Sequence, residues 1–125
     1  MTAPRLVAAL TGLLTLVPVG VAGHAFLVKS SPARRAVLTQ PPARVDLWFN
    51  ERLEGAYSRL SVVDAEGRRV DRGDGAVGRD DGARRLTVSL PPITPGTYTV
   101  RYRVLSVDGH VVDDAFSFTV KDGTR

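Results

Sequence analysis

The chain has 125 residues, a formal net charge of +4, two histidines, one methionine and no cysteine. Without a thiol there can be no disulfide framework, no cysteine-ligated zinc or iron–sulfur site and no cysteine nucleophile. The length indicates one domain, and the hydrophobic (43%) and charged (24%) fractions exclude a wholly disordered chain. Arginines alternate with aspartates between Asp64 and Arg85, which predicts a mixed, solvated surface and no nucleic-acid site.

The first 23 residues have the layout of a secretory signal peptide. A single basic residue, Arg5, precedes an apolar run over residues 6–17, and a proline and several small residues follow. The run is short for a transmembrane anchor, which is the alternative interpretation. We expect cleavage after Gly23, so that residues 1–23 are removed and the exported mature chain comprises residues 24–125.

The mature part is predicted to be one all-β domain. Short segments rich in β-branched and aromatic residues alternate with turn signals, and no segment shows a helical period. We expect strands at 24–30, 44–50, 57–64, 68–71, 84–90, 97–106 and 111–121, and an exposed loop at 72–83. Alternate residues of the second, sixth and seventh of these strands are apolar, so each should bury one face. The pattern predicts a small Greek-key, immunoglobulin-like β-sandwich or barrel of about seven strands.

His24 would become the first residue of the mature chain. A lone histidine is more often a surface or capped side chain than a metal ligand. At a free N-terminus, however, it offers both its α-amine and its imidazole nitrogen, and these two atoms can chelate one metal ion together. One residue would then supply two ligands.

The second histidine, His110, follows Asp108 and Gly109 in a turn between two predicted strands. Glycine lets the backbone fold tightly enough to aim both flanking side chains at one point, although a simple hairpin turn is the alternative. Together with His24 these residues offer three nitrogens and one oxygen. Such a tetragonal set suits Cu(II), which the Irving–Williams order also favours, whereas zinc prefers a tetrahedron.

Four segments of the chain resemble the CopC family of exported copper-binding proteins. They are residues 24–32 (HAFLVKSSP), 45–51 (VDLWFNE), 95–110 (PGTYTVRYRVLSVDGH) and 116–120 (FSFTV). The resemblance implies that His24, Asp108 and His110 bind one Cu(II) per mature chain. It also implies that Glu51 lies beside this site and orients a histidine ring. An exposed carboxylate at the end of a strand is the alternative for Glu51.

Some members of that family carry a methionine-rich loop that binds Cu(I), but residues 24–125 contain no methionine. Cu(I) binding through thioethers is therefore not expected. The sequence predicts a monomeric copper carrier or buffer, not an enzyme, that is soluble after cleavage and lies in a periplasm or outside the cell. The resemblance suggests a membrane copper transporter of the CopD type as its partner. A copper oxidase or monooxygenase with a histidine brace, and an immunoglobulin-like interaction module without metal, stay open as alternatives.

Overall fold

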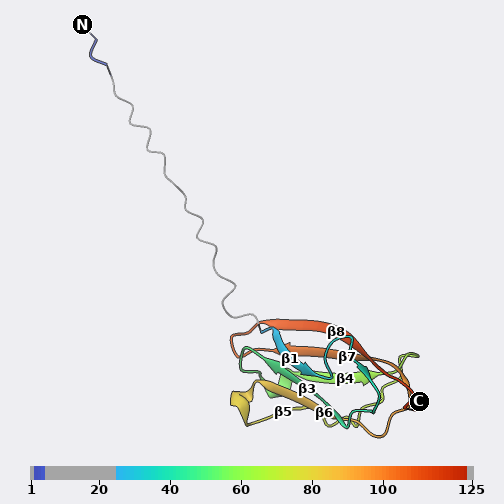
Figure 1. Cartoon of the computed structure of the whole chain (residues 1–125). Coiled ribbons are helices and arrows are strands. Elements are labelled where there is room, and N and C mark those ends of the chain that lie inside the picture. Colours follow the sequence, from blue (N-terminus) through green and yellow to red (C-terminus); the bar gives the residue numbers. More distant parts are fainter. Residues whose placement is uncertain (1, 5–24, 124–125) are drawn as a thin grey trace.

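A computed structural model of the chain describes residues 2–4 and 25–123. Within them lie eight strands and two single-turn 3₁₀ helices (Figure 1). The elements are β1 (Leu27–Ser31), β2 (Val37–Leu38), β3 (Arg44–Phe49), η1 (Gly55–Tyr57), β4 (Arg59–Val63), β5 (Ala76–Val77), η2 (Asp81–Ala83), β6 (Arg85–Ser89), β7 (Gly96–Leu105) and β8 (Val111–Val120). No helix in this described part is long and apolar enough to cross a membrane.

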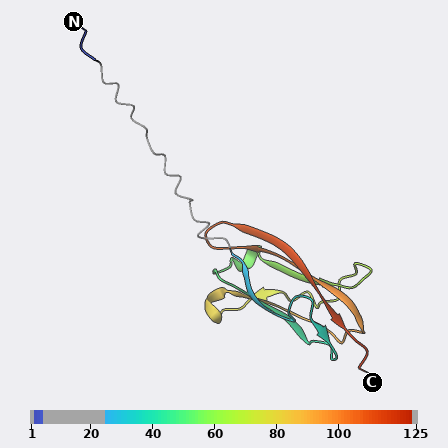
Figure 2. The same cartoon turned by 45° about the horizontal axis from the view of Figure 1, so that its top comes forward.

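The strands form two four-stranded sheets, with the orders β1-β3-β6-β5 and β2-β8-β7-β4. All pairs are antiparallel except β2 with β8, which is parallel. The chain passes repeatedly from one sheet to the other, and the two sheets lie face to face as layers of a sandwich (Figures 1 and 2). The predicted all-β sandwich is confirmed. It has eight strands instead of the seven expected, because two strands of two residues each were not predicted and the strand predicted at 68–71 does not form.

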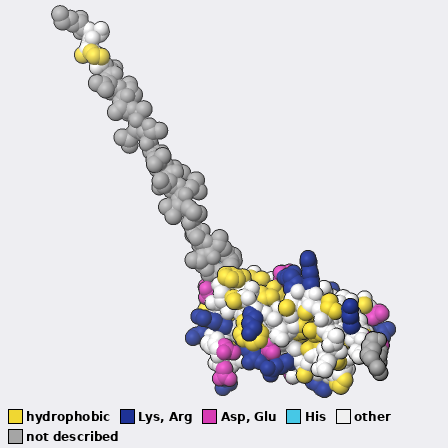
Figure 3. Space-filling view, viewed as in Figure 1, with side chains coloured by type: hydrophobic (Ala, Val, Ile, Leu, Met, Phe, Trp, Pro, Cys, Tyr) yellow, Lys and Arg dark blue, Asp and Glu magenta, His cyan; other side chains and the backbone are white. Residues whose placement is uncertain are grey.

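The core lies between the sheets and follows the predicted alternation. Alternate residues along β3, β7 and the second half of β8 are buried: Val45, Leu47, Phe49, Tyr98, Val100, Tyr102, Val104, Phe116, Phe118 and Val120. Aromatic rings join the layers, because Phe49 of one sheet meets Tyr102 of the other edge-to-face, with ring centroids 5.6 Å apart. Outside this core, basic and acidic side chains are interspersed on the face of the domain seen in Figure 3.

The carboxylate of Asp46 on β3 is buried among cationic and hydroxyl partners. It accepts hydrogen bonds from Arg85 at 2.7 and 2.9 Å and from Thr87, and it pairs with Arg44 at 2.9 Å. Burial alone would raise the pKa of Asp46, but the hydrogen bonds and the two guanidinium charges outweigh it and lower the pKa. Folding therefore favours the ionised form of the Asp46 carboxyl group.

The prediction of a strand at 68–71 was wrong. Only one isolated bridge, between Val63 and Arg69, forms there. The reason is a side chain: Asp71 accepts the backbone N–H of Val62 at 2.8 Å and so takes the place that a backbone carbonyl would occupy in a ladder.

Two other boundaries differ from the prediction. Within the described residues the first strand begins at Leu27 and not at the start of the expected range 24–30, and it runs to Ser31. The expected loop at 72–83 contains β5, which pairs with β6, and β2 was not predicted at all. A strand of two residues is too short to show alternation, so neither left a signal in the sequence.

Candidate metal centre

The turn between β7 and β8, here called the 106–110 turn, is held by backbone hydrogen bonds. Ser106 donates its N–H to the carbonyl of His110 at 3.0 Å, and Gly109 donates to the carbonyl of Ser106 at 2.9 Å. Gly109 has a φ of 92°, a left-handed conformation that residues with a Cβ rarely adopt. The predicted turn at these residues is confirmed, and its tightness brings the side chains before and after the glycine to one side.

Asp108 and His110 lie in contact in this turn. Their Oδ2 and Nδ1 atoms are 3.1 Å apart, and the two side chains are 30% and 46% exposed. The hydroxyl of the buried Ser106 donates to Oδ1 of Asp108, and the N–H of His110 donates to the same oxygen at 3.3 Å. The hydrogen bond from Ser106 is the main cause that lowers the pKa of Asp108, and the contact with His110 adds to it.

This pair has the spacing of two neighbouring ligands on one ion. Atoms bound at right angles in a tetragonal plane, at bond lengths of about 2.0 Å, are about 2.8 Å apart. The observed 3.1 Å between Oδ2 and Nδ1 is close to that value. The contact is also that of an ion pair or hydrogen bond, and it leaves a carboxylate oxygen and an imidazole nitrogen side by side, as two ligands of one divalent ion would be.

The start of the described domain reaches the same end of the sandwich. The N–H of Phe26 donates to Oδ1 of Asn50 at 2.6 Å, and the N–H of Asn50 donates back to the carbonyl of Phe26 at 3.2 Å. In Figure 1 the first end of β1 (blue) and the connection between β7 and β8 (orange) lie together. Ala25, the residue before Phe26, is only 1% exposed.

Residues 50–53, which follow β3, contact both parts. Beyond the contacts of Asn50 with Phe26, the carbonyl of Arg52 accepts the N–H of Val107 at 3.0 Å, and Leu53 forms a bridge with Ser106. The 50–53 segment therefore places the N-terminal segment and the 106–110 turn side by side.

Two of the predicted site residues are not joined to this pair by the structure. His24 lies outside the described residues. Glu51 is half-buried beside Asn50. In residues 2–4 and 25–123, no three His, Asp or Glu side chains come close enough together to hold a metal ion. The roles assigned to His24 and Glu51 stay predictions.

Two residues without a predicted role orient the site: Ser106 orients the turn, and Asn50 orients the N-terminal segment. Both residues lie inside segments that resemble the CopC family, 95–110 and 45–51. Asn50 contacts a residue far away along the chain, and Ser106 contacts residues within its own turn. The alternation of apolar residues in the strands therefore does not predict either contact.

Comparison with known proteins agrees with this fold. The CopC domain family matches residues 27–121. The copper transport protein CutJ of Bacillus subtilis is 33% identical over 98 residues, which cover 78% of this chain but only 18% of CutJ. Protein YobA of Escherichia coli K12 is 32% identical over 107 residues, or 86% of each chain. The crystal structure of CopC from Methylosinus trichosporium OB3b superposes with a TM-score of 0.72 at 36% identity, over 82% of this chain and 98% of that one. The chain therefore belongs to the CopC family of copper resistance and transport proteins.

Proposed function

We propose that this chain is exported, that cleavage after Gly23 frees residue 24, and that the mature protein binds one Cu(II) as a carrier or buffer. The ligands are the α-amine and imidazole of His24, a carboxylate oxygen of Asp108 and an imidazole nitrogen of His110. The observation that carries the proposal is the pair of Asp108 and His110, 3.1 Å apart and oriented by the hydroxyl of Ser106.

Chain connectivity supports the part played by His24. Only Ala25 separates it from Phe26, and two residues of chain span at most about 7 Å. Phe26 is hydrogen-bonded to Asn50 at the same end of the sandwich as the 106–110 turn. The first residue of the mature chain would therefore begin within reach of the turn.

The chemistry of the four donors favours binding over catalysis. Three nitrogens and one carboxylate oxygen fill the plane of a tetragonal Cu(II) ion and leave no open equatorial position for a substrate. The anionic oxygen of Asp108 stabilises Cu(II) against reduction. The mature chain would act as a monomer, and a membrane copper transporter of the CopD type is the partner that membership in the CopC family suggests.

The experiment compares two N-termini. The full chain is exported from a bacterial host, the start of the secreted protein is sequenced, and its Cu(II) affinity is measured by competition with a chelator. A variant that keeps one extra residue before His24 has the same side chains but a blocked amine. Changing groups around a metal ligand costs about 10–100-fold in affinity, so loss of a ligand should cost more than about 100-fold.

Electron paramagnetic resonance provides a second readout. The loaded protein should give a type-2 Cu(II) signal with nitrogen couplings, and His110→Ala should remove one set of them. Equal affinity of the two N-termini would refute the amine ligand. An unchanged spectrum in His110→Ala would refute the turn as part of the site.

A further inference from the structure

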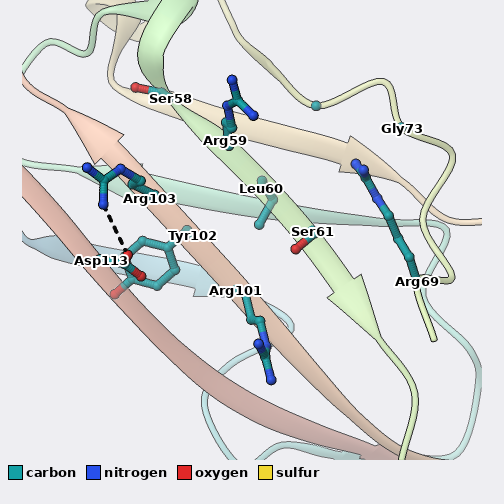
Figure 4. Close-up of a pocket in the computed structure, with 11 residues that line it drawn as sticks. Ser58, Arg59, Leu60, Ser61, Arg69, Gly73, Arg101, Tyr102, Arg103 and Asp113 are labelled. Carbon is teal, nitrogen blue, oxygen red and sulfur yellow. Dashed lines mark hydrogen bonds and ion pairs between the residues drawn. The ribbon is translucent and has the colours of Figure 1, made fainter. Parts of the chain in front are cut away.

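A hollow with a volume of about 390 Å³ lies on the outer face of the β2-β8-β7-β4 sheet, and none of the predicted metal ligands lines it. Four arginines line it, and we call it the arginine groove: Arg59, Arg69, Arg101 and Arg103. Figure 4 shows Arg59 on β4, Arg101 and Arg103 on β7, and Arg69 on the chain that follows β4. Two neighbouring strands and a loop thus bring positive charge to one concavity.

Two of these four arginines have no ion-pair partner among the described residues. Arg103 pairs with Asp113 at 3.3 Å, and Arg69 pairs with Asp71 at 2.9 Å. Among the ion pairs of residues 25–123, none involves Arg59 or Arg101. A surface that leaves cations unpaired in a hollow is complementary to an anionic partner.

The register makes the arrangement unfavourable for the isolated domain. Arg59 lies directly opposite Arg103 across β4 and β7. Like charges at directly opposite positions of an antiparallel pair repel each other and destabilise the sheet. A carboxylate bound by Arg59 would reduce the repulsion.

A second hollow of about 380 Å³ adjoins the arginine groove and shares Arg59 and Arg103 with it. Its other lining is apolar: Ala56, Tyr57, Leu105 and Val111. Tyr57 is 67% exposed and Val111 49% exposed, so large apolar side chains face solvent there. Leu105 and Val111 form the last residue pair before the 106–110 turn, which places this apolar hollow beside that turn.

We propose that the arginine groove and the apolar hollow together bind an acidic segment of a partner protein. Glutamate or aspartate side chains would pair with Arg59 and Arg101, whose planar guanidinium groups match a carboxylate with two hydrogen bonds. An aliphatic or aromatic side chain of the same segment would pack against Tyr57 and Val111. Arginine and tyrosine are enriched at protein interfaces, and a groove that combines charged and apolar lining fits a polypeptide better than a flat lipid surface.

This docking surface needs no metal, so its test uses metal-free protein purified after export. The probe is a fluorescein-labelled peptide of several glutamates followed by leucine and phenylalanine, and fluorescence anisotropy at low salt reports binding. The double variant Arg59→Glu/Arg101→Glu should weaken binding roughly tenfold or more. The control, Arg68→Glu/Arg79→Glu, makes the same change of charge at two exposed arginines outside both hollows.

Amide shift mapping on the unaltered protein gives an independent readout that does not depend on the variants. The shifts should be confined to β4, β7, η1 and the start of β8, and Tyr57→Ala should weaken binding of the peptide. Equal weakening by the two double variants would overturn the proposal, since net charge alone would then explain binding. So would competition by inorganic phosphate at equal ionic strength, which indicates a small-anion site, or binding to phosphatidylglycerol vesicles without binding to the peptide.

Discussion

Arg59→Glu should stabilise the domain, although it alters a charged residue on the surface. Arg59 faces Arg103 directly across β4 and β7, and the substitution replaces a repulsive pair by an attractive one. Cross-strand charge pairs are worth about 0.2–1 kcal/mol each. Both side chains are exposed and screened by solvent, and Arg103 already pairs with Asp113, so we expect the free energy of unfolding to rise by about 0.2–0.5 kcal/mol.

For a domain of this size, 1 kcal/mol corresponds to about 4–8 °C in Tm. The measurement is urea and thermal unfolding followed by circular dichroism at low and high salt. Arg59→Gln is the control, because it removes the repulsion without adding an attraction and should give a smaller gain. Salt should reduce the gain of Arg59→Glu. A loss of stability, or equal gains for glutamate and glutamine, would refute the reasoning from register.

Three further predictions concern the turn and the buried carboxylate. Ser106→Ala removes the hydroxyl that orients Asp108 and should lower Cu(II) affinity about 10–100-fold in a chelator competition; an unchanged affinity would contradict this. Gly109→Ala places a Cβ at a φ of 92° and should lower the free energy of unfolding by about 1 kcal/mol or more, whereas Gly78→Ala, which has no such conformation, should cost less in the same urea titration. The pKa of Asp46 is lowered by folding, so its stabilisation is complete above an unfolded-state pKa of about 3.9 and is lost as the pH falls through its folded pKa. Asp46→Asn should flatten the decline in unfolding free energy below about pH 4, and an equally steep decline in this variant would argue against that origin.

The strands that could be predicted from the sequence are those that show a pattern within a single segment of the chain. Alternation over six to ten residues marked β3, β7 and β8, because each strand has one face in the core. Strands of two residues show no period, and 68–71 looked like a strand although the side chain of Asp71 had replaced the backbone partner.

In the candidate site, too, a feature formed by neighbouring residues was predictable and contacts between distant residues were not. The Asp108–Gly109–His110 turn was predictable, because glycine between two polar residues and two strong strands is a local signal. The hydrogen bond of Asn50 to Phe26 joins residues 24 positions apart, so only the folded sheets reveal it. The arginine groove was missed for a similar reason: arginines scattered along the chain gather only through the register of β4 and β7.

The 50–53 segment contacts Phe26, the residue before β1 of one sheet, and Val107 in the β7–β8 turn of the other. An ion held jointly by the N-terminal residue and that turn would act as a cross-link between the two layers of the sandwich. Loading would then raise the stability of the whole domain with the logarithm of free copper. Removal of the ion would withdraw that cross-link and its contribution to the stability of the domain.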